Sequence, residues 1–139
     1  NKVLCVHGGL SSSISSLDEI GALNRFSDVP DEGPIHDLLW TDLDDRPGWS
    51  RLPGRSSGYT HQGPDVTRSF LDGHGLSLFL RSRNLVIDGH AFSQGGCCLT
   101  IFSAPNYCNR CGNRGAVAEF NEDLQIAFRT FSAVPWPAQ

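Results

Sequence analysis

Two segments of this chain, about a hundred residues apart, place reactive side chains beside short apolar runs. Residues 3–11 read VLCVHGGLS, and residues 103–113 read SAPNYCNRCGN directly after an apolar run. In each, the apolar run gives way abruptly to polar, Gly or Pro residues, as where a buried strand delivers functional groups to the rim of a sheet. The first segment carries the imidazole of His7, and the second carries the phenol of Tyr107. The pair predicts two edges of a functional site.

His7 ends the first apolar run and is followed by two glycines, which allow a tight turn and leave a ring nitrogen facing a cleft. Neutral imidazole is the commonest side-chain ligand of transition metals. The pattern therefore predicts a metal ligand, with a hydrogen-bonded structural histidine as the alternative. Tyr107 is open to two interpretations in the same way. One interpretation is that the Tyr107 ring forms a pocket wall and its hydroxyl donates a hydrogen bond. The other is that the ring holds its own loop to the core.

Arg55 is a third candidate and lies in a Gly/Ser-rich stretch, residues 53–60. A guanidinium on such a loop can offer two parallel hydrogen bonds to a phosphate. The alternative is a solvated loop arginine.

Cysteine usage indicates the redox compartment more than a metal site. The chain has five cysteines, an odd number, and Cys97 and Cys98 are adjacent, which does not resemble a disulfide framework. Cys108 and Cys111 have the spacing of a zinc knuckle, but a structural zinc site needs four ligands and the adjacent pair cannot complete it. We interpret them as ordinary thiols and predict a reducing compartment, cytoplasmic or nuclear.

Composition excludes several classes of protein. With 139 residues, 39% of them hydrophobic, the chain fits one soluble domain with a real core. Its net charge of −4 argues against a nucleic-acid binder, and no apolar run approaches the roughly 18 residues of a membrane helix. The chain has no Met and opens inside a predicted strand, without a signal peptide. We therefore expect it to be a piece of a longer protein.

The elements that position these side chains form an α+β pattern, with helices early and a mostly antiparallel sheet late. Ser16 and Glu19 have the spacing of a capping box, Asp88-Gly89 is a hairpin signal, and residues 41–64 lack a regular pattern. Helices are predicted at 17–24, 35–40 and 65–71, and strands at 2–6, 76–80, 85–87, 90–92, 98–102, 116–120 and 124–131.

In order along nearly the whole chain, these segments resemble the C-terminal half of the metal-dependent serine/threonine phosphoprotein phosphatases, most of all the type 2A-like branch. The matching stretches are VHGGLS at 6–11, LDEI at 17–20, DVPDEGP at 28–34, DLLWTD at 37–42, DDRPGW at 44–49, GYT at 58–60, IFSAPNYC at 101–108 and RCGN at 110–113.

The resemblance implies a partial metallophosphatase-type β-sandwich with flanking helices. Residues 1–134 would be the C-terminal half of a calcineurin-like domain, and residues 135–139 a frayed tail. The implied reaction is metal-assisted hydrolysis of phosphoserine and phosphothreonine, with two Mn, Fe or Zn ions. His7 would be a metal ligand, Arg55 the catalytic and substrate-binding phosphate clamp, and Tyr107 a substrate-binding residue. The implied partners are phosphoprotein substrates and scaffold or regulatory subunits of the type 2A kind, without nucleic acid or membrane.

Three departures from the family pattern count against activity of this chain alone. The motifs of the family's N-terminal half, which supply most metal ligands and the general acid, are absent from the sequence. Arg83 stands where the family has a ligand histidine, and a guanidinium cannot coordinate a cation. His90, opposite in the predicted hairpin, is the one compensating candidate. The loops on either side of Gly58 are longer than in the family, which shifts Arg55 in register.

Three hypotheses follow for the chain as it stands. The first is a truncated phosphatase that is inactive alone and binds no metal tightly. The second is a catalytically dead binding or decoy module that keeps a regulatory-subunit surface. The third is a product that does not fold stably, because half of a two-layer sheet leaves an apolar face and a strand edge uncovered.

Overall fold

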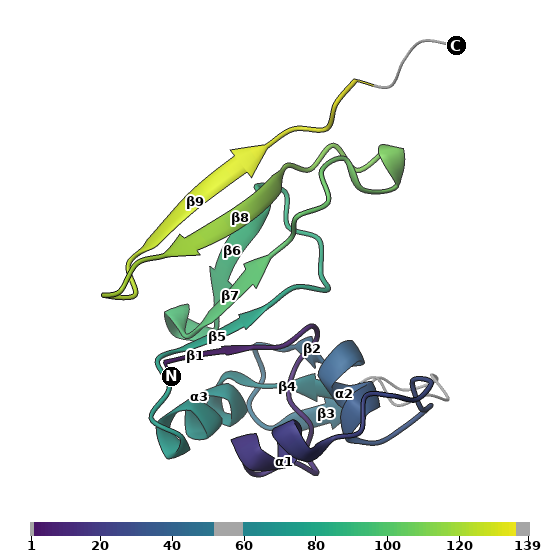
Figure 1. The fold of residues 1–139 in the computed structure, drawn as a ribbon, viewed down its shortest axis with the longest axis vertical. Coiled ribbons are helices and arrows are strands. Elements are labelled where there is room, and N and C mark those ends of the chain that lie inside the picture. The colour runs from purple at the N-terminus through teal and green to yellow at the C-terminus, as the bar shows by residue number, and fades with distance from the viewer. Residues whose placement is uncertain (1, 52–59, 136–139) are drawn as a thin grey trace. The chain divides into compact units, whose positions relative to one another are not determined.

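The structure is a computed structural model that describes residues 2–51 and 60–135. Its parts group into two compact units, Asn1–Arg83 with Phe92–Leu99, and Asn84–Ala91 with Thr100–Gln139 (Figure 1). The predicted α+β class is confirmed. The elements in chain order are β1 (Val3–Cys5), α1 (Leu17–Ala22), α2 (Pro34–Trp40), β2 (Asp42–Leu43), β3 (Trp49–Arg51), β4 (Thr60–Gln62), α3 (Pro64–Gly73), β5 (Leu78–Arg81), β6 (His90–Ser93), β7 (Cys98–Ile101), β8 (Gly115–Phe120) and β9 (Ile126–Phe131), with 3-10 turns at Gln94–Gly96 and Tyr107–Asn109.

The three helices of the first unit begin within one residue of the predicted starts, α1 at the predicted residue and α2 and α3 one residue earlier. At α1 the capping box is complete: Ser16 Oγ accepts a hydrogen bond from the Glu19 amide, and the Glu19 carboxylate accepts one from the Ser16 amide, both at 3.2 Å. Helices α2 and α3 each begin with a proline, whose missing N–H costs nothing in the first turn. Local signals therefore fix the starts of all three helices.

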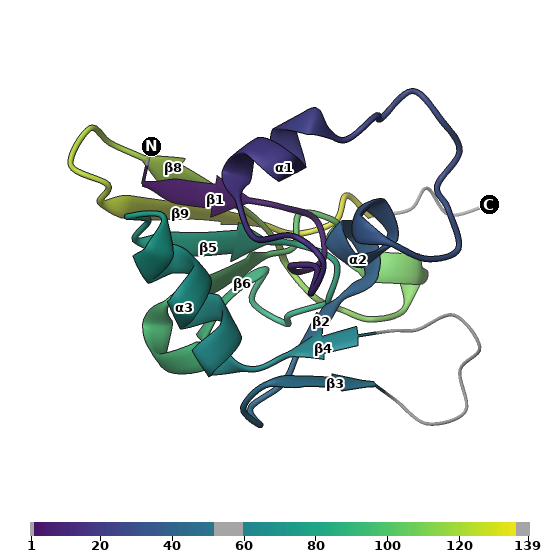
Figure 2. The ribbon, with the colours of Figure 1, turned by 90° about the horizontal axis from the view of Figure 1, so that it is seen from below.

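Strands of the first unit belong to two sheets. Strands β1 and β5 pair in parallel and belong to a four-stranded sheet of order β1-β5-β7-β6. A small second sheet has the order β2-β4-β3, with β2 parallel and β3 antiparallel to β4 (Figure 2). The second sheet corrects the expectation that residues 41–64 lack regular structure. Its strands are two or three residues long, which is too short for a period of two to be visible in the sequence.

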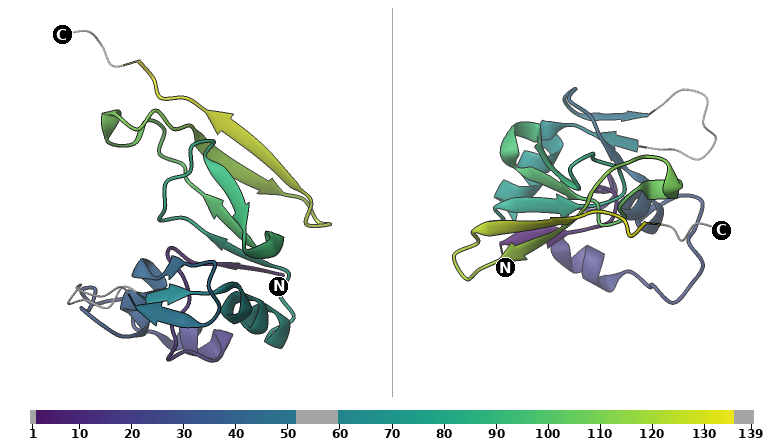
Figure 3. Two further views of the ribbon diagram at one scale, coloured as in Figure 1. Left: turned by 180° about the vertical axis from the view of Figure 1, so that it is seen from behind. Right: turned by 90° about the horizontal axis from the view of Figure 1, so that it is seen from above.

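The second unit contains the predicted C-terminal hairpin. Strands β8 and β9 pair antiparallel over their full length, from Gly115 opposite Phe131 to Phe120 opposite Ile126 (Figure 3). The predicted hairpin around Asp88-Gly89 is wrong, because residues 85–87 form no strand. The Ile87 carbonyl accepts from the Arg114 amide, and the Gly89 carbonyl accepts from the Phe102 amide. The carbonyls that would close a local hairpin thus accept hydrogen bonds from residues that are distant along the chain.

Two of the five cysteines belong to the core of the first unit. Cys97 and Cys98 are 3% and 0% exposed and pack in a cluster with Leu10, Leu71 and Phe79. Burial raises the pKa of the Cys98 thiol to about 11. Cys108 and Cys111, in the second unit, are exposed.

This difference predicts the order in which iodoacetamide alkylates the folded chain. Near pH 8 only about a thousandth of Cys98 is thiolate, the reactive form, and its sulfur is also covered. We expect Cys108 and Cys111 to be modified first, and Cys98 only after denaturant is added. Peptide mass spectrometry over time measures each rate, and alkylation of Cys98 at the rate of Cys108 in native buffer would contradict the buried core.

Candidate functional site

His7 lies directly after β1, at the end of the parallel pairing with β5. The Val6 amide donates to the Leu80 carbonyl at 3.0 Å, and the Ser82 amide donates to the His7 carbonyl at 3.1 Å. The ladder therefore continues past the strand and fixes the backbone of His7 beside the end of β5. Its side chain is exposed. The structure confirms that a strand end presents this imidazole at the rim of the sheet.

The two glycines after His7 are required by close approach to α2. The Gly8 amide donates to the Leu38 carbonyl at 2.7 Å, and a Cβ on Gly8 would lie 2.6 Å from the Leu39 carbonyl. A Cβ on Gly9 would lie 2.6 Å from both Gln62 Oε1 and Thr41 Cγ2. Real Cβ contacts are not this short, so only glycine fits at these positions.

A buried amide network then holds the turn. Gln62 is fully buried, and its Oε1 accepts a hydrogen bond from the Leu10 amide at 2.5 Å. Its Nε2 donates to Thr67 Oγ1 at 2.8 Å, and Thr67 Oγ1 donates to Gln94 Oε1 at 2.6 Å. Side chains from β4, α3 and the 3-10 turn thus lock the segment that carries His7. No local pattern signals this role of Gln62, because the Leu10 amide that it accepts from is 52 positions away along the chain.

Two arginines share one carboxylate next to the same turn. Arg81 is 2% exposed, and its Nε donates to the Gly8 carbonyl at 2.5 Å. Asp42 Oδ1 lies 2.5 Å from Arg83 Nη1 and 3.7 Å from Arg81 Nη2. The Arg83 guanidinium also lies 5.3 Å from the centre of the Trp40 ring, within cation–π range. Arg83 is therefore held in an ion pair.

Of these residues the sequence singled out only Arg83. Arg81 directly follows the apolar run 76–80, and a charged residue so placed is rarely buried without a partner. That position is the signal that could have found Arg81, but nothing local names Asp42 as its partner.

The arginines set the electrostatics at His7. Partial burial lowers the pKa of His7, and the positive charges of Arg81 and Arg83 lower it further. The imidazole is thereby favoured in the neutral form that a metal ligand needs. The same two guanidinium groups repel a divalent cation, and the described residues contain no group of three or more His, Cys, Asp or Glu that could hold one. The described residues around His7 therefore do not form a site for a resident metal ion.

Tyr107 lies in the second unit and is 48% exposed. Its ring meets Phe102 edge-on, at 5.3 Å between centroids. The buried Asn113 side chain accepts from the Tyr107 amide and donates to the Ala104 carbonyl, both at 2.8 Å. The ring is thus anchored on its own loop while half of it faces solvent, so the structure is compatible with both interpretations of Tyr107.

The remaining candidates lie outside the described residues or in the second unit. Arg55 and most of its loop lie outside the described residues, as do positions 136–139 of the predicted tail. His90 belongs to the second unit, where its ring stacks on Phe128 at 3.9 Å and its Nδ1 lies 3.2 Å from the Asp88 carbonyl. Because residues 85–87 form no strand, the hairpin that would place His90 opposite Arg83 does not exist. Within the described part of the first unit, the structure brings His7 together with Arg81 and Arg83.

Comparison with known proteins identifies a family and structural relatives. The family model described as calcineurin-like phosphoesterase matches residues 1–82. A solved structure from Saccharomyces cerevisiae, a protein serine/threonine phosphatase with similarity to human phosphatase PP5, is 34% identical and superposes with a TM-score of 0.86. The match covers 98% of this chain and 46% of that one, so the chain spans about half the length of its structural relative. Among the described helices, none has the length and apolarity to cross a membrane.

Proposed function

Because this chain belongs to the calcineurin-like phosphoesterase family, whose members generally use two divalent metals, we propose that it is the C-terminal half of a protein serine/threonine phosphatase domain. We assign residues 1–134 to that half and place it nearest the type 2A-like branch. The ordered motifs support this assignment, as does a structural relative twice the length of the chain. The complete domain would hydrolyse phosphoserine and phosphothreonine in proteins.

In that complete domain His7 would face the metals, which would be Mn, Fe or Zn. Arg55 would clamp the phosphate and Tyr107 would contact the substrate. We further propose a cytoplasmic or nuclear protein that meets phosphoprotein substrates and scaffold or regulatory subunits of the type 2A kind.

We propose that the chain alone does not hydrolyse phosphomonoesters. The observation that carries this proposal is the Arg83–Asp42 ion pair beside His7. In this family the metals activate water and neutralise the phosphate. Here a permanent cation would occupy a ligand position, and His7 belongs to no group of three or more potential ligands among the described residues. This half supplies the His7 imidazole, whose backbone is held beside β5 and whose lowered pKa favours the neutral form, together with the two guanidinium groups of Arg81 and Arg83.

The test is turnover of an aryl phosphate by the purified chain with added Mn²⁺. We expect a rate equal to that of Mn²⁺ in buffer without protein, at every metal concentration. The matched control is His7→Ala, which should give the same rate. Metal-dependent turnover that His7→Ala abolishes would overturn the proposed inactivity.

The ion pair also favours a second candidate, a binding module that has lost catalysis. Arg83 is fixed by Asp42 and Trp40, so the substitution is accommodated within an ordered site. In the same preparation, retention by an immobilised type 2A scaffold subunit without turnover would favour the module over an inert fragment.

A further inference from the structure

Five serines lie between Leu10 and the start of α1. Residues 11–19 read SSSISSLDE, so Ser15 and Ser16 are each followed three positions later by an acid. Ser12 and Ser13 are followed at the same distance by serines. An acid three positions after a serine is the pattern that an acidophilic serine kinase recognises, because basic side chains of the kinase bind that carboxylate.

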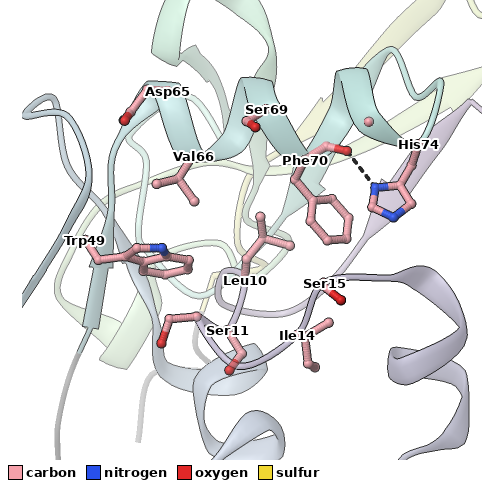
Figure 4. A pocket seen from close by; sticks show the side chains of 12 residues that line it. Leu10, Ser11, Ile14, Ser15, Trp49, Asp65, Val66, Ser69, Phe70 and His74 are labelled. Carbon is pink, nitrogen blue, oxygen red and sulfur yellow. Dashed lines mark hydrogen bonds between the residues drawn. The ribbon is translucent and has the colours of Figure 1, made fainter.

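The two serines with an acid at this distance are open to another protein. Ser15 is exposed and Ser16 is half-buried. Ser15 also lines an open cavity together with Leu10 and one face of α3 (Figure 4). The two acids, Asp18 and Glu19, belong to the first turn of α1 and are exposed. The hydroxyl of Ser15 and both carboxylates therefore lie at the surface of the first unit.

Helix α1 is weakly supported by packing. It has six residues, all of them half-buried or exposed, and Leu17 at its start packs against the hydrophobic core. A helix this short is marginal on its own, and a segment with few buried contacts opens locally at low cost. A kinase, which binds its substrate as an extended chain, can therefore engage residues 15–19.

The capping box of α1 joins the two serines to one carboxylate. Glu19 Oε2 accepts from the Ser15 amide at 2.6 Å and from the Ser16 amide at 3.2 Å. The Ser15 hydroxyl lies 3.2 and 3.3 Å from the two carboxylate oxygens. The hydrogen bond from the Ser15 amide is the main cause that lowers the pKa of Glu19, so this carboxylate is ionised at neutral pH.

A phosphate on either hydroxyl would bring a charge of about −1.5 to −2 next to the Glu19 carboxylate. Phosphate is favourable at many helix starts, where backbone amides accept it as a partner. Here the amides of Ser15 and Ser16 already donate to Glu19, so the phosphate meets a like charge and competes for the same donors. Phosphorylation at this position therefore opposes the capping box.

We propose that Ser15 and Ser16 form a phosphorylation site for an acidophilic serine kinase, and that the phosphate opens the capping box and loosens α1. The kinase transfers the γ-phosphoryl group of ATP. A bond forms between the serine Oγ and phosphorus, the bond to the β-phosphate oxygen breaks, ADP leaves and the hydroxyl proton passes to a base of the kinase. The site does not use the residues around His7, so it does not depend on the proposed function.

The test is incubation of the full chain with ATP and a serine kinase that requires an acid three positions after its acceptor. Peptide mass spectrometry at early times locates the phosphate. We expect Ser15 or Ser16 to be modified at least about tenfold faster than Ser12 or Ser13, which are exposed on the same segment. Equal rates at all four serines, or an unmodified Ser15-Ser16 pair, would overturn the proposal.

A double variant removes the acids and keeps both hydroxyls. Asp18→Asn with Glu19→Gln should lower the initial rate at Ser15 and Ser16 roughly tenfold, while glutamine at position 19 still closes the capping box. The matched control is Glu122→Gln with Asp123→Asn, an exposed pair of acids between β8 and β9, which should leave the rate unchanged. Thermal unfolding verifies the fold, and an unchanged rate in the Asp18/Glu19 variant would contradict recognition of these acids.

Amide hydrogen exchange tests the effect on the helix. Loss of the capping box should raise the exchange rates of the α1 amides about fivefold in the phosphorylated chain, and leave those of α3 unchanged. In a Glu19→Gln chain, phosphorylated by longer incubation, the increase should be smaller because the like charge is gone. Equal exchange of α1 before and after phosphorylation would refute the opening of the capping box.

Discussion

Replacing Gly9 with alanine should destabilise the first unit by about 2–4 kcal/mol, a large share of the stability of an ordinary domain. The new Cβ would lie 2.6 Å from Gln62 Oε1, the atom that accepts the Leu10 amide, and equally close to Thr41 Cγ2. Relieving the contact requires Gln62 to move, which disrupts a fully buried network, or requires the turn to shift. Urea unfolding followed by circular dichroism measures the loss of unfolding free energy.

Gly21→Ala is the matched control, because a Cβ there meets nothing within 4 Å and the position is inside α1. Alanine is the better helix former, so this variant should be up to about 1 kcal/mol more stable. If the two variants have the same stability, the close packing of the turn after His7 is refuted.

Replacing Asp42 with asparagine should cost about 2–3 kcal/mol of unfolding free energy. Asp42 contacts both Arg81 and Arg83, and Arg81 is almost completely buried. Removing one partner of a buried ion pair leaves a charge without its counterion in a poorly solvated place. Because Asp42 is itself 23% exposed, the cost falls below the upper range for fully buried pairs.

A double-mutant cycle tests whether the cost arises from this pairing. Adding Arg83→Gln to Asp42→Asn should recover part of the lost stability, since one of the two cations that faced the Asp42 carboxylate is removed. Glu119→Gln is the control, because its ion pair with Arg129 is exposed and should contribute nothing measurable. If the loss in the double variant equals the sum of the losses in Asp42→Asn and Arg83→Gln alone, Arg83 and Asp42 are not coupled.

Local signals in the sequence were sufficient for part of the fold. The capping box of α1 and the pattern of β8 and β9 act within a few residues and gave the predicted elements, whereas the predicted starts at 35 and 65 did not use the prolines that begin α2 and α3. The same holds for His7, since an apolar run followed by two glycines locates a strand end. These features are determined by hydrogen bonds and packing between near neighbours, which a single sequence displays.

Local signals predicted the wrong structure where backbone groups distant along the chain take the hydrogen bonds that a local hairpin would need. Asp88-Gly89 is a strong turn signal, and the turn does form, with the Gly89 amide bonded to the Val86 carbonyl. The flanking strand does not, because Phe102 and Arg114 take the carbonyls of Gly89 and Ile87. The strands of the β2-β4-β3 sheet were missed for a related reason: each is too short to carry a pattern of its own.

By itself the sequence determined the family resemblance, the strand end that carries His7 and the cation at position 83. Only the tertiary structure decided what surrounds them: Gln62 on the Leu10 amide, and Asp42 between two arginines. These arrangements join residues 52 and 41 positions apart. Polar side chains at such separations find partners only after the strands pair and the helices pack, so no local pattern encodes which acid meets which base.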